Sequence, residues 1–159
     1  MVLQLYPKLL YKMHDLIKKT IKAAQDLQKC QDNFCKKEKE HFNKDQYKIN
    51  VEINELFEKL KDNKIDRDKY HKQLMKIRVN MMSSKPNRDL VNCSINNCES
   101  NMRIAFESML DMFKANKDLY AQDPMKKAYF EGKKLLKDTK KIDVKKYMNI
   151  TMLISNALI

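Results

Sequence analysis

The sequence predicts an all-α fold: a long antiparallel helical hairpin with a kink near Pro86, followed by one or two shorter C-terminal helices. Three observations predict it. Gly132 is the only glycine and there are three prolines in 159 residues, too few for the turns of β-rich folds or for phosphate-binding loops. Apolar residues recur every three or four positions over most of the chain. One polar segment, residues 62–66, divides the patterned region into two arms.

The first arm is expected to form one helix over about residues 8–61, because it contains no proline or glycine after Pro7. A charged patch at residues 36–40 interrupts the apolar stripe, but its side chains can stay solvated on a continuous helix. The stripe consists of Met13, Ile17, Thr20, Ala24, Leu27, Gln31 and Phe34, and it resumes at Phe42, Ile49, Ile53, Leu56 and Leu60.

The second arm begins after the turn at residues 62–66. Asn63 tolerates the left-handed backbone that ends helices, and Asp66 is a suitable N-cap for the next helix. Pro86 removes a backbone donor, so a break or sharp kink is expected there. A third helix should then run over about residues 87–116. Its apolar stripe is Val91, Ile95, Cys98, Met102, Ala105, Met109 and Met112.

Residues 117–159 are expected to form a basic helical extension of a hairpin domain that spans residues 1–116. Asp123 with Pro124 is suited to begin one helix that ends near residue 137, and Asp143 is suited to cap another. The segment from residue 115 to the C-terminus holds ten lysines and five acidic residues, a net charge of +5. No internal repeat or low-complexity tract is apparent.

Four cysteines carry the most specific signal. Four residues separate Cys30 from Cys35, and four also separate Cys93 from Cys98. In an antiparallel hairpin that turns near residue 64, facing residue numbers add up to 128, which places Cys30 opposite Cys98 and Cys35 opposite Cys93. Two disulfides between the arms are therefore expected, and each would constrain the unfolded chain.

The geometry of an α-helix opposes this arrangement. Residues five apart differ by about 140° around the axis, so both members of a pair cannot face one partner helix. Cys30 and Cys98 lie on the apolar stripes, whereas Cys35 and Cys93 flank them, so a local π-bulge or underwinding is needed for the second bridge. Four free thiols are the alternative. Zinc binding and thiol catalysis are disfavoured, because the chain has no pair of cysteines separated by two residues.

Paired cysteines on two helical arms resemble those of the coiled-coil-helix-coiled-coil-helix proteins of the mitochondrial intermembrane space and their twin-cysteine relatives. Cys30, Cys35, Cys93 and Cys98 carry the resemblance, which covers only the hairpin. It implies an accessory or assembly role without a catalytic site. A disulfide-linked minor capsid protein of a large DNA virus fits the same physical features.

The chain carries a net charge of +12, which favours an anionic partner such as nucleic acid, an anionic membrane face or an acidic protein. Lysine is spread along the whole sequence and arginine is sparse, so a merely solvated basic surface is the alternative. Neither a classical secretory signal nor a transmembrane segment is expected. The expected location is a disulfide-permissive compartment, such as the mitochondrial intermembrane space, or a virion.

Both ends of the chain hold more apolar residues than a thin hairpin can cover. The first group lies within residues 1–11 and the second within residues 142–159. The second group is expected to bind protein subunits of a larger assembly, or else to fold back on the methionine-lined third helix. Its members are Tyr147, Ile150, Met152, Leu153, Ile154, Leu158 and Ile159.

The function predicted from these features is that of a non-catalytic structural or assembly subunit, needing no metal or cofactor. A nucleic-acid-binding accessory protein, of a ribosomal or packaging type, is the main alternative because of the basic charge. An enzyme is disfavoured, since the sequence contains no phosphate-binding loop, nucleophile elbow or paired carboxylates.

Overall fold

The computed structural model describes the backbone of residues 5–158 and the side chains of residues 12–158. Within that range every regular element is a helix, so the predicted all-α class is confirmed. The helices are α1 (Leu5–Phe34), α2 (Lys36–Lys61), α3 (Arg67–Met82), α4 (Lys85–Asn97), α5 (Glu99–Ala115), α6 (Lys117–Tyr120), α7 (Asp123–Lys137) and α8 (Val144–Ala157).

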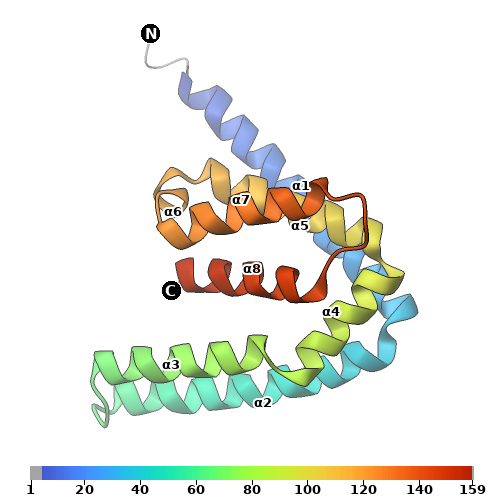
Figure 1. The fold of residues 1–159 in the computed structure, drawn as a ribbon. Helices are drawn as coiled ribbons and strands as arrows, with labels where there is room; N and C mark the ends of the chain where they lie inside the picture. Colours follow the sequence, from blue (N-terminus) through green and yellow to red (C-terminus); the bar gives the residue numbers. More distant parts are fainter. Residues whose placement is uncertain (1–4, 159) are drawn as a thin grey trace.

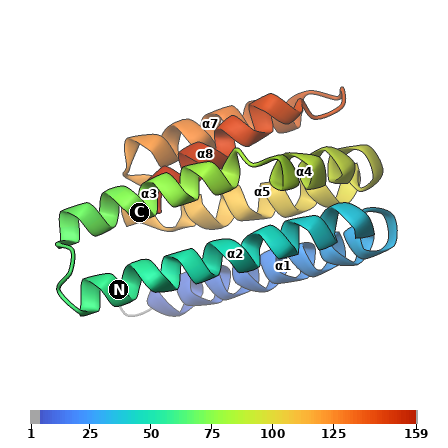
Figure 2. The same cartoon turned by 90° about the horizontal axis from the view of Figure 1, so that it is seen from below.

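The hairpin is bent into a C (Figure 1). One arm of the C contains α1, α5 and α7, the other contains α2 and α3, and α4 lies at the bend between them. Helix α8 lies inside the C and contacts α7, α4 and α3. Seen from below, α1 and α2 run along one side of the molecule, and α3, α4 and α5 run alongside them (Figure 2). The chain therefore forms a bent hairpin whose opening is filled by its own last helix.

Local sequence signals account for the ends of most helices. Asn63 adopts a φ of 56°, the left-handed conformation expected in the turn. The Asp66 carboxylate accepts a hydrogen bond from the Lys69 backbone N–H over 2.7 Å, and Asp143 caps α8 through Lys146 in the same way over 2.8 Å. The break expected near Pro86 falls between α3 and α4, where Ser84 is the N-cap.

The prediction of one uninterrupted helix over residues 8–61 was wrong, and so was that of one helix over residues 87–116. The first arm breaks at Cys35, which has φ −127° and ψ 32°. The second breaks at Cys98, which has φ −131° and ψ 33°. Both breaks fall at disulfide-linked cysteines, where the cross-link overrides a sequence that is otherwise compatible with continuous helix.

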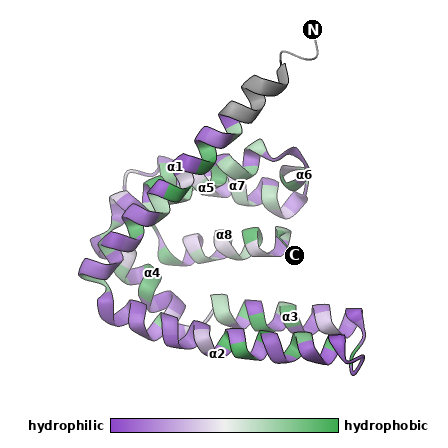
Figure 3. Cartoon of the chain, turned by 180° about the vertical axis from the view of Figure 1, so that it is seen from behind, coloured by the Kyte–Doolittle hydropathy of each residue, from purple (hydrophilic) through white to green (hydrophobic). Residues whose placement is uncertain are grey.

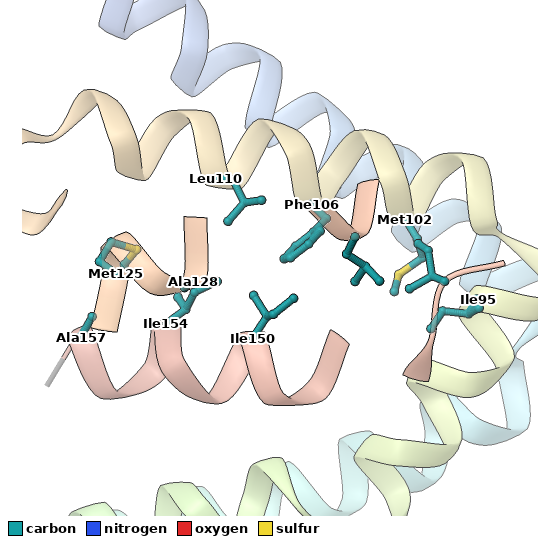
Figure 4. Close-up of a cluster of buried hydrophobic side chains, with 11 residues drawn as sticks. Ile95, Met102, Phe106, Leu110, Met125, Ala128, Ile150, Ile154 and Ala157 are labelled. Carbon is teal, nitrogen blue, oxygen red and sulfur yellow. The ribbon is translucent and has the colours of Figure 1, made fainter. Parts of the chain in front are cut away.

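The main core lies between α5, α7 and α8 and includes residues of the C-terminal segment, so hairpin and extension share one core. Phe106 and Leu110 of α5 point toward Ile150 and Ile154 of α8 (Figure 4). Gly132 permits the close approach of α7 to α5, because a Cβ atom there would lie 2.6 Å from Leu110 Cδ1. A smaller cluster of Leu56, Leu74 and Ile77 joins α2 to α3.

Candidate functional site

The four cysteines lie at the bend of the C and form two disulfides. Cys30 is joined to Cys98 with an S–S distance of 2.03 Å, and Cys35 is joined to Cys93 with an S–S distance of 2.09 Å. The Cα–Cα distance is 6.0 Å in each bridge. This is the pairing expected from the antiparallel register. Thr20 and Ser108 continue that register along α1 and α5, since the Thr20 hydroxyl lies 3.3 Å from the Ser108 carbonyl oxygen.

The backbone breaks resolve the geometric objection to two bridges. Cys35 and Cys98 are buried, whereas Cys30 and Cys93 are partly exposed on intact helices. Each disulfide therefore joins one buried cysteine at a helix break to one partly exposed cysteine within a helix. The expectation that Cys35 only flanks the buried face was wrong, because the break at Cys35 rotates it inward.

The two cysteine segments are related by local pseudo-twofold symmetry and form an internal repeat, so the expectation that the chain has no repeat was wrong. The residues from 22 to 35 and from 85 to 98 share the pattern Lys-x-x-x-Asp-Leu-x-x-Cys-x-x-Asn-x-Cys. Equivalent residues make equivalent contacts: Lys22 pairs with Asp26 over 3.5 Å, and Lys85 pairs with Asp89 over 2.6 Å. A comparison of the chain with itself at an offset of 63 positions would have found this signal.

The sulfur environments repeat in the same way. Cys30 Sγ lies 3.7 Å from the Asn97 carbonyl oxygen, and Cys93 Sγ lies 3.6 Å from the Phe34 carbonyl oxygen. Neither sulfur carries a proton in the disulfide, so these contacts are not hydrogen bonds. Each carbonyl belongs to the residue just before a break, and each lies beside the bridge that the next residue, the cysteine at the break, forms.

The C-terminal helices form a second candidate site, a groove of about 800 Å³ between α7 and α8. Its inner wall contains the buried Leu135 and Ile150 and the half-buried Met152 and Leu153. Its rim carries six charged residues, all exposed, four basic and two acidic: Lys127, Lys134, Lys137, Lys146, Glu131 and Asp138.

Ion pairs fix α7 against α5 and leave the groove on the far side of α7 open. Lys133 Nζ lies 2.7 Å from Asp111 Oδ1 and 3.3 Å from Glu107 Oε1. Burial lowers the pKa of Lys133, but the two carboxylates outweigh that effect and hold its pKa above the ordinary value. Arg103 donates to the Leu136 and Lys140 carbonyl oxygens over 3.3 and 2.6 Å, which satisfies acceptors near the end of α7.

The residues predicted to bind partners fall into different environments. Ile150 and Ile154 lie in the main core, as in the intramolecular alternative, and Tyr147 packs against Phe106 with ring centroids 5.1 Å apart. Burial raises the pKa of Tyr147 to about 12. The others remain accessible in part or in full: Met152 and Leu153 in the groove, and Leu158, 54 % exposed, at the end of α8. Ile159 and the side chains of residues 1–11 lie outside the described residues.

Among the side chains that the structure describes, no group of three or more histidine, cysteine, aspartate or glutamate residues is arranged to hold a metal ion. No helix in this part of the chain has the length and hydropathy needed to cross a bilayer. Comparisons of the chain with protein families, curated proteins and solved structures found no match.

Proposed function

We propose that the protein is a non-catalytic structural subunit of a large assembly, in which the disulfide-linked bend holds two helical arms at a fixed angle. The observation that carries the proposal is the twin cross-link at the bend. Two disulfides join α1 to the helix break at Cys98 and α4 to the helix break at Cys35. Because the bend is cross-linked at two points, the two arms resist opening away from each other. The paired helices at the bend also resist sliding past each other along their axes.

The surface of the chain supports an assembly role. Its accessible area is 11349 Å², compared with about 8400 Å² expected for a compact monomer of this mass. Several large apolar side chains are exposed on different helices. The most exposed are Tyr47 at 72 %, Phe130 at 65 % and Phe34 at 64 %. Hydrophilic residues, in purple, predominate along most of the chain in Figure 3. Single apolar side chains spread over several helices are common on monomers, so it is the large accessible area that supports contacts with neighbouring subunits.

The proposal is tested by recovering the tagged protein from its native source without reductant, after alkylation of free thiols. We expect a stable complex with other proteins and an intact mass that shows no alkylated cysteine. Recovery as a lone monomer, or a mass with four alkylated thiols, would contradict the proposal. The identity of the co-purified proteins would show whether the protein is located in the mitochondrial intermembrane space or in a virion.

A nucleic-acid-binding role is the second candidate, favoured by the net charge of +12. It predicts that the affinity for an oligonucleotide falls steeply with salt, with a log–log slope of about −0.9 for each neutralised phosphate. A tight complex at physiological salt would place this role first. We expect only weak and unspecific binding, because few arginines are available for base recognition.

A further inference from the structure

The groove between α7 and α8 combines two features that together select a class of partner. Its wall is apolar and accessible at Met152 and Leu153, and its rim is basic, with a charge of +2 from four lysines and two acidic residues. Among the described residues, none of the four rim lysines forms an ion pair within the chain, whereas Lys133 on the opposite face of α7 is held by two carboxylates. Four lysines without an ion-pair partner in the described residues therefore border the groove.

We propose that this groove binds an acidic amphipathic helix of a neighbouring protein subunit, an inference that rests on the assembly role proposed above. An apolar stripe on such a helix would cover Met152 and Leu153, and carboxylates on either side of the stripe would meet the rim lysines. The length is suitable, since α8 has 14 residues and is about 21 Å long, enough to support four turns of a partner helix.

The same residues disfavour nucleic acid as the occupant. A phosphate backbone makes no use of the apolar wall, and it would be repelled by Glu131 and Asp138 on the rim. All basic residues of the rim are lysines, which lack the planar donor geometry of arginine for phosphate and base contacts. The charge complement of this groove is therefore a carboxylate-bearing surface that also carries apolar side chains.

The chain offers a closely matched test. Lys127 and Lys146 line the groove, whereas their sequence neighbours Lys126 and Lys145 are exposed outside it on the same two helices. The double variants Lys127→Glu/Lys146→Glu and Lys126→Glu/Lys145→Glu change the net charge equally. The probe is a labelled synthetic helix of about 14 residues, with leucine along one face and glutamate beside it, and fluorescence anisotropy is measured at physiological salt.

We expect the probe to bind the full-length oxidised protein. The Lys127→Glu/Lys146→Glu variant should lower the affinity for the probe about tenfold, because its new carboxylates directly oppose those of the probe. The control variant Lys126→Glu/Lys145→Glu should lower it less than about twofold. The Met152→Ser variant should also weaken binding, because it removes apolar wall without touching the main core. Unchanged melting temperatures would show that all variants fold.

Three results would overturn the inference: no binding of the probe, equal losses in the two double variants, or an oligonucleotide bound more tightly than the probe with the same dependence on the groove lysines. The proposed assembly role is judged separately by recovery of the unmodified protein from its source. If the protein is recovered in a complex but the probe does not bind, the partner chemistry is wrong and the assembly role stands.

Discussion

Gln31 donates a hydrogen bond from its Nε2 atom to the Oγ atom of Ser94 over 2.9 Å, between the two disulfides. The two residues occupy equivalent positions, each directly after the first cysteine of its pair, so this bond spans the pseudo-twofold axis. Ser94 is fully buried, and its own hydroxyl donates to the Leu90 carbonyl oxygen over 2.7 Å. A polar contact therefore fixes the distance between α1 and α4 at the bend.

Substitution of either residue by alanine is expected to lower the free energy of unfolding by about 1 kcal/mol, the usual contribution of a hydrogen bond in a protein interior. The Gln31→Ala/Ser94→Ala double variant should lose less than the two single losses combined, because both remove the same bond. Urea denaturation of the four proteins measures the coupling. Strict additivity would show that the two side chains act independently.

The two disulfides should stabilise the fold in a non-additive way. The first bridge to form in the unfolded chain closes a long loop and stabilises the fold by more than about 4 kcal/mol. Once it is present, the second bridge closes a ring of only about a dozen residues and adds roughly 3 kcal/mol. Replacing all four cysteines by alanine should therefore cost more than the summed losses from Cys30→Ala/Cys98→Ala and Cys35→Ala/Cys93→Ala. Guanidinium denaturation of the three variants and the native protein decides the matter. Losses that simply add would contradict the nested arrangement of the bridges.

The helix break at Cys35 should disappear when its bridge is removed. Residues on both sides favour helix, and Cys35 supplies no side-chain cap to α2, so the break depends on the cross-link. In Cys35→Ala/Cys93→Ala we expect the backbone amides of residues 36–38 to become more protected from hydrogen exchange, as α1 and α2 join. Alanine is used because serine is itself a helix N-cap and would favour the break. In Cys30→Ala/Cys98→Ala, which keeps the bridge at Cys35, these amides should exchange as in the native protein.

Tyr147 should make the protein sensitive to alkaline pH. Its folded-state pKa of about 12 lies above the unfolded value of 10.0, so the folded chain holds the phenol proton more tightly. The stabilising contribution is complete below pH 10 and is lost as the pH rises toward 12, by roughly 2–3 kcal/mol in total. The Tyr147→Phe variant keeps the ring packed on Phe106 but has no proton to lose. Its unfolding free energy should fall less between pH 10 and 11.5 than that of the native protein, and equal losses would refute the assignment.

Much of the fold was predictable because it depends on local chemistry. The left-handed turn at Asn63, the caps at Asp66 and Asp143, and the break near Pro86 each follow from the conformational preferences of one residue and its neighbours. The cysteine pairing was also predictable, since an antiparallel hairpin with a known turn fixes which positions face each other.

The sequence by itself determined the helical class, the turn at residues 62–66 and the register of the arms, because these follow from apolar periodicity, from the preferences of single residues and from the matched cysteine spacings. Only the tertiary structure decided the breaks at Cys35 and Cys98, where cross-links between distant segments outweigh helix propensity. It also decided that α8 lies within the bend of its own chain, with Ile150 and Ile154 in the core and Met152 and Leu153 left accessible. An apolar stripe shows that a helix must be covered, but what covers it depends on the shape of the surface that the rest of the chain presents.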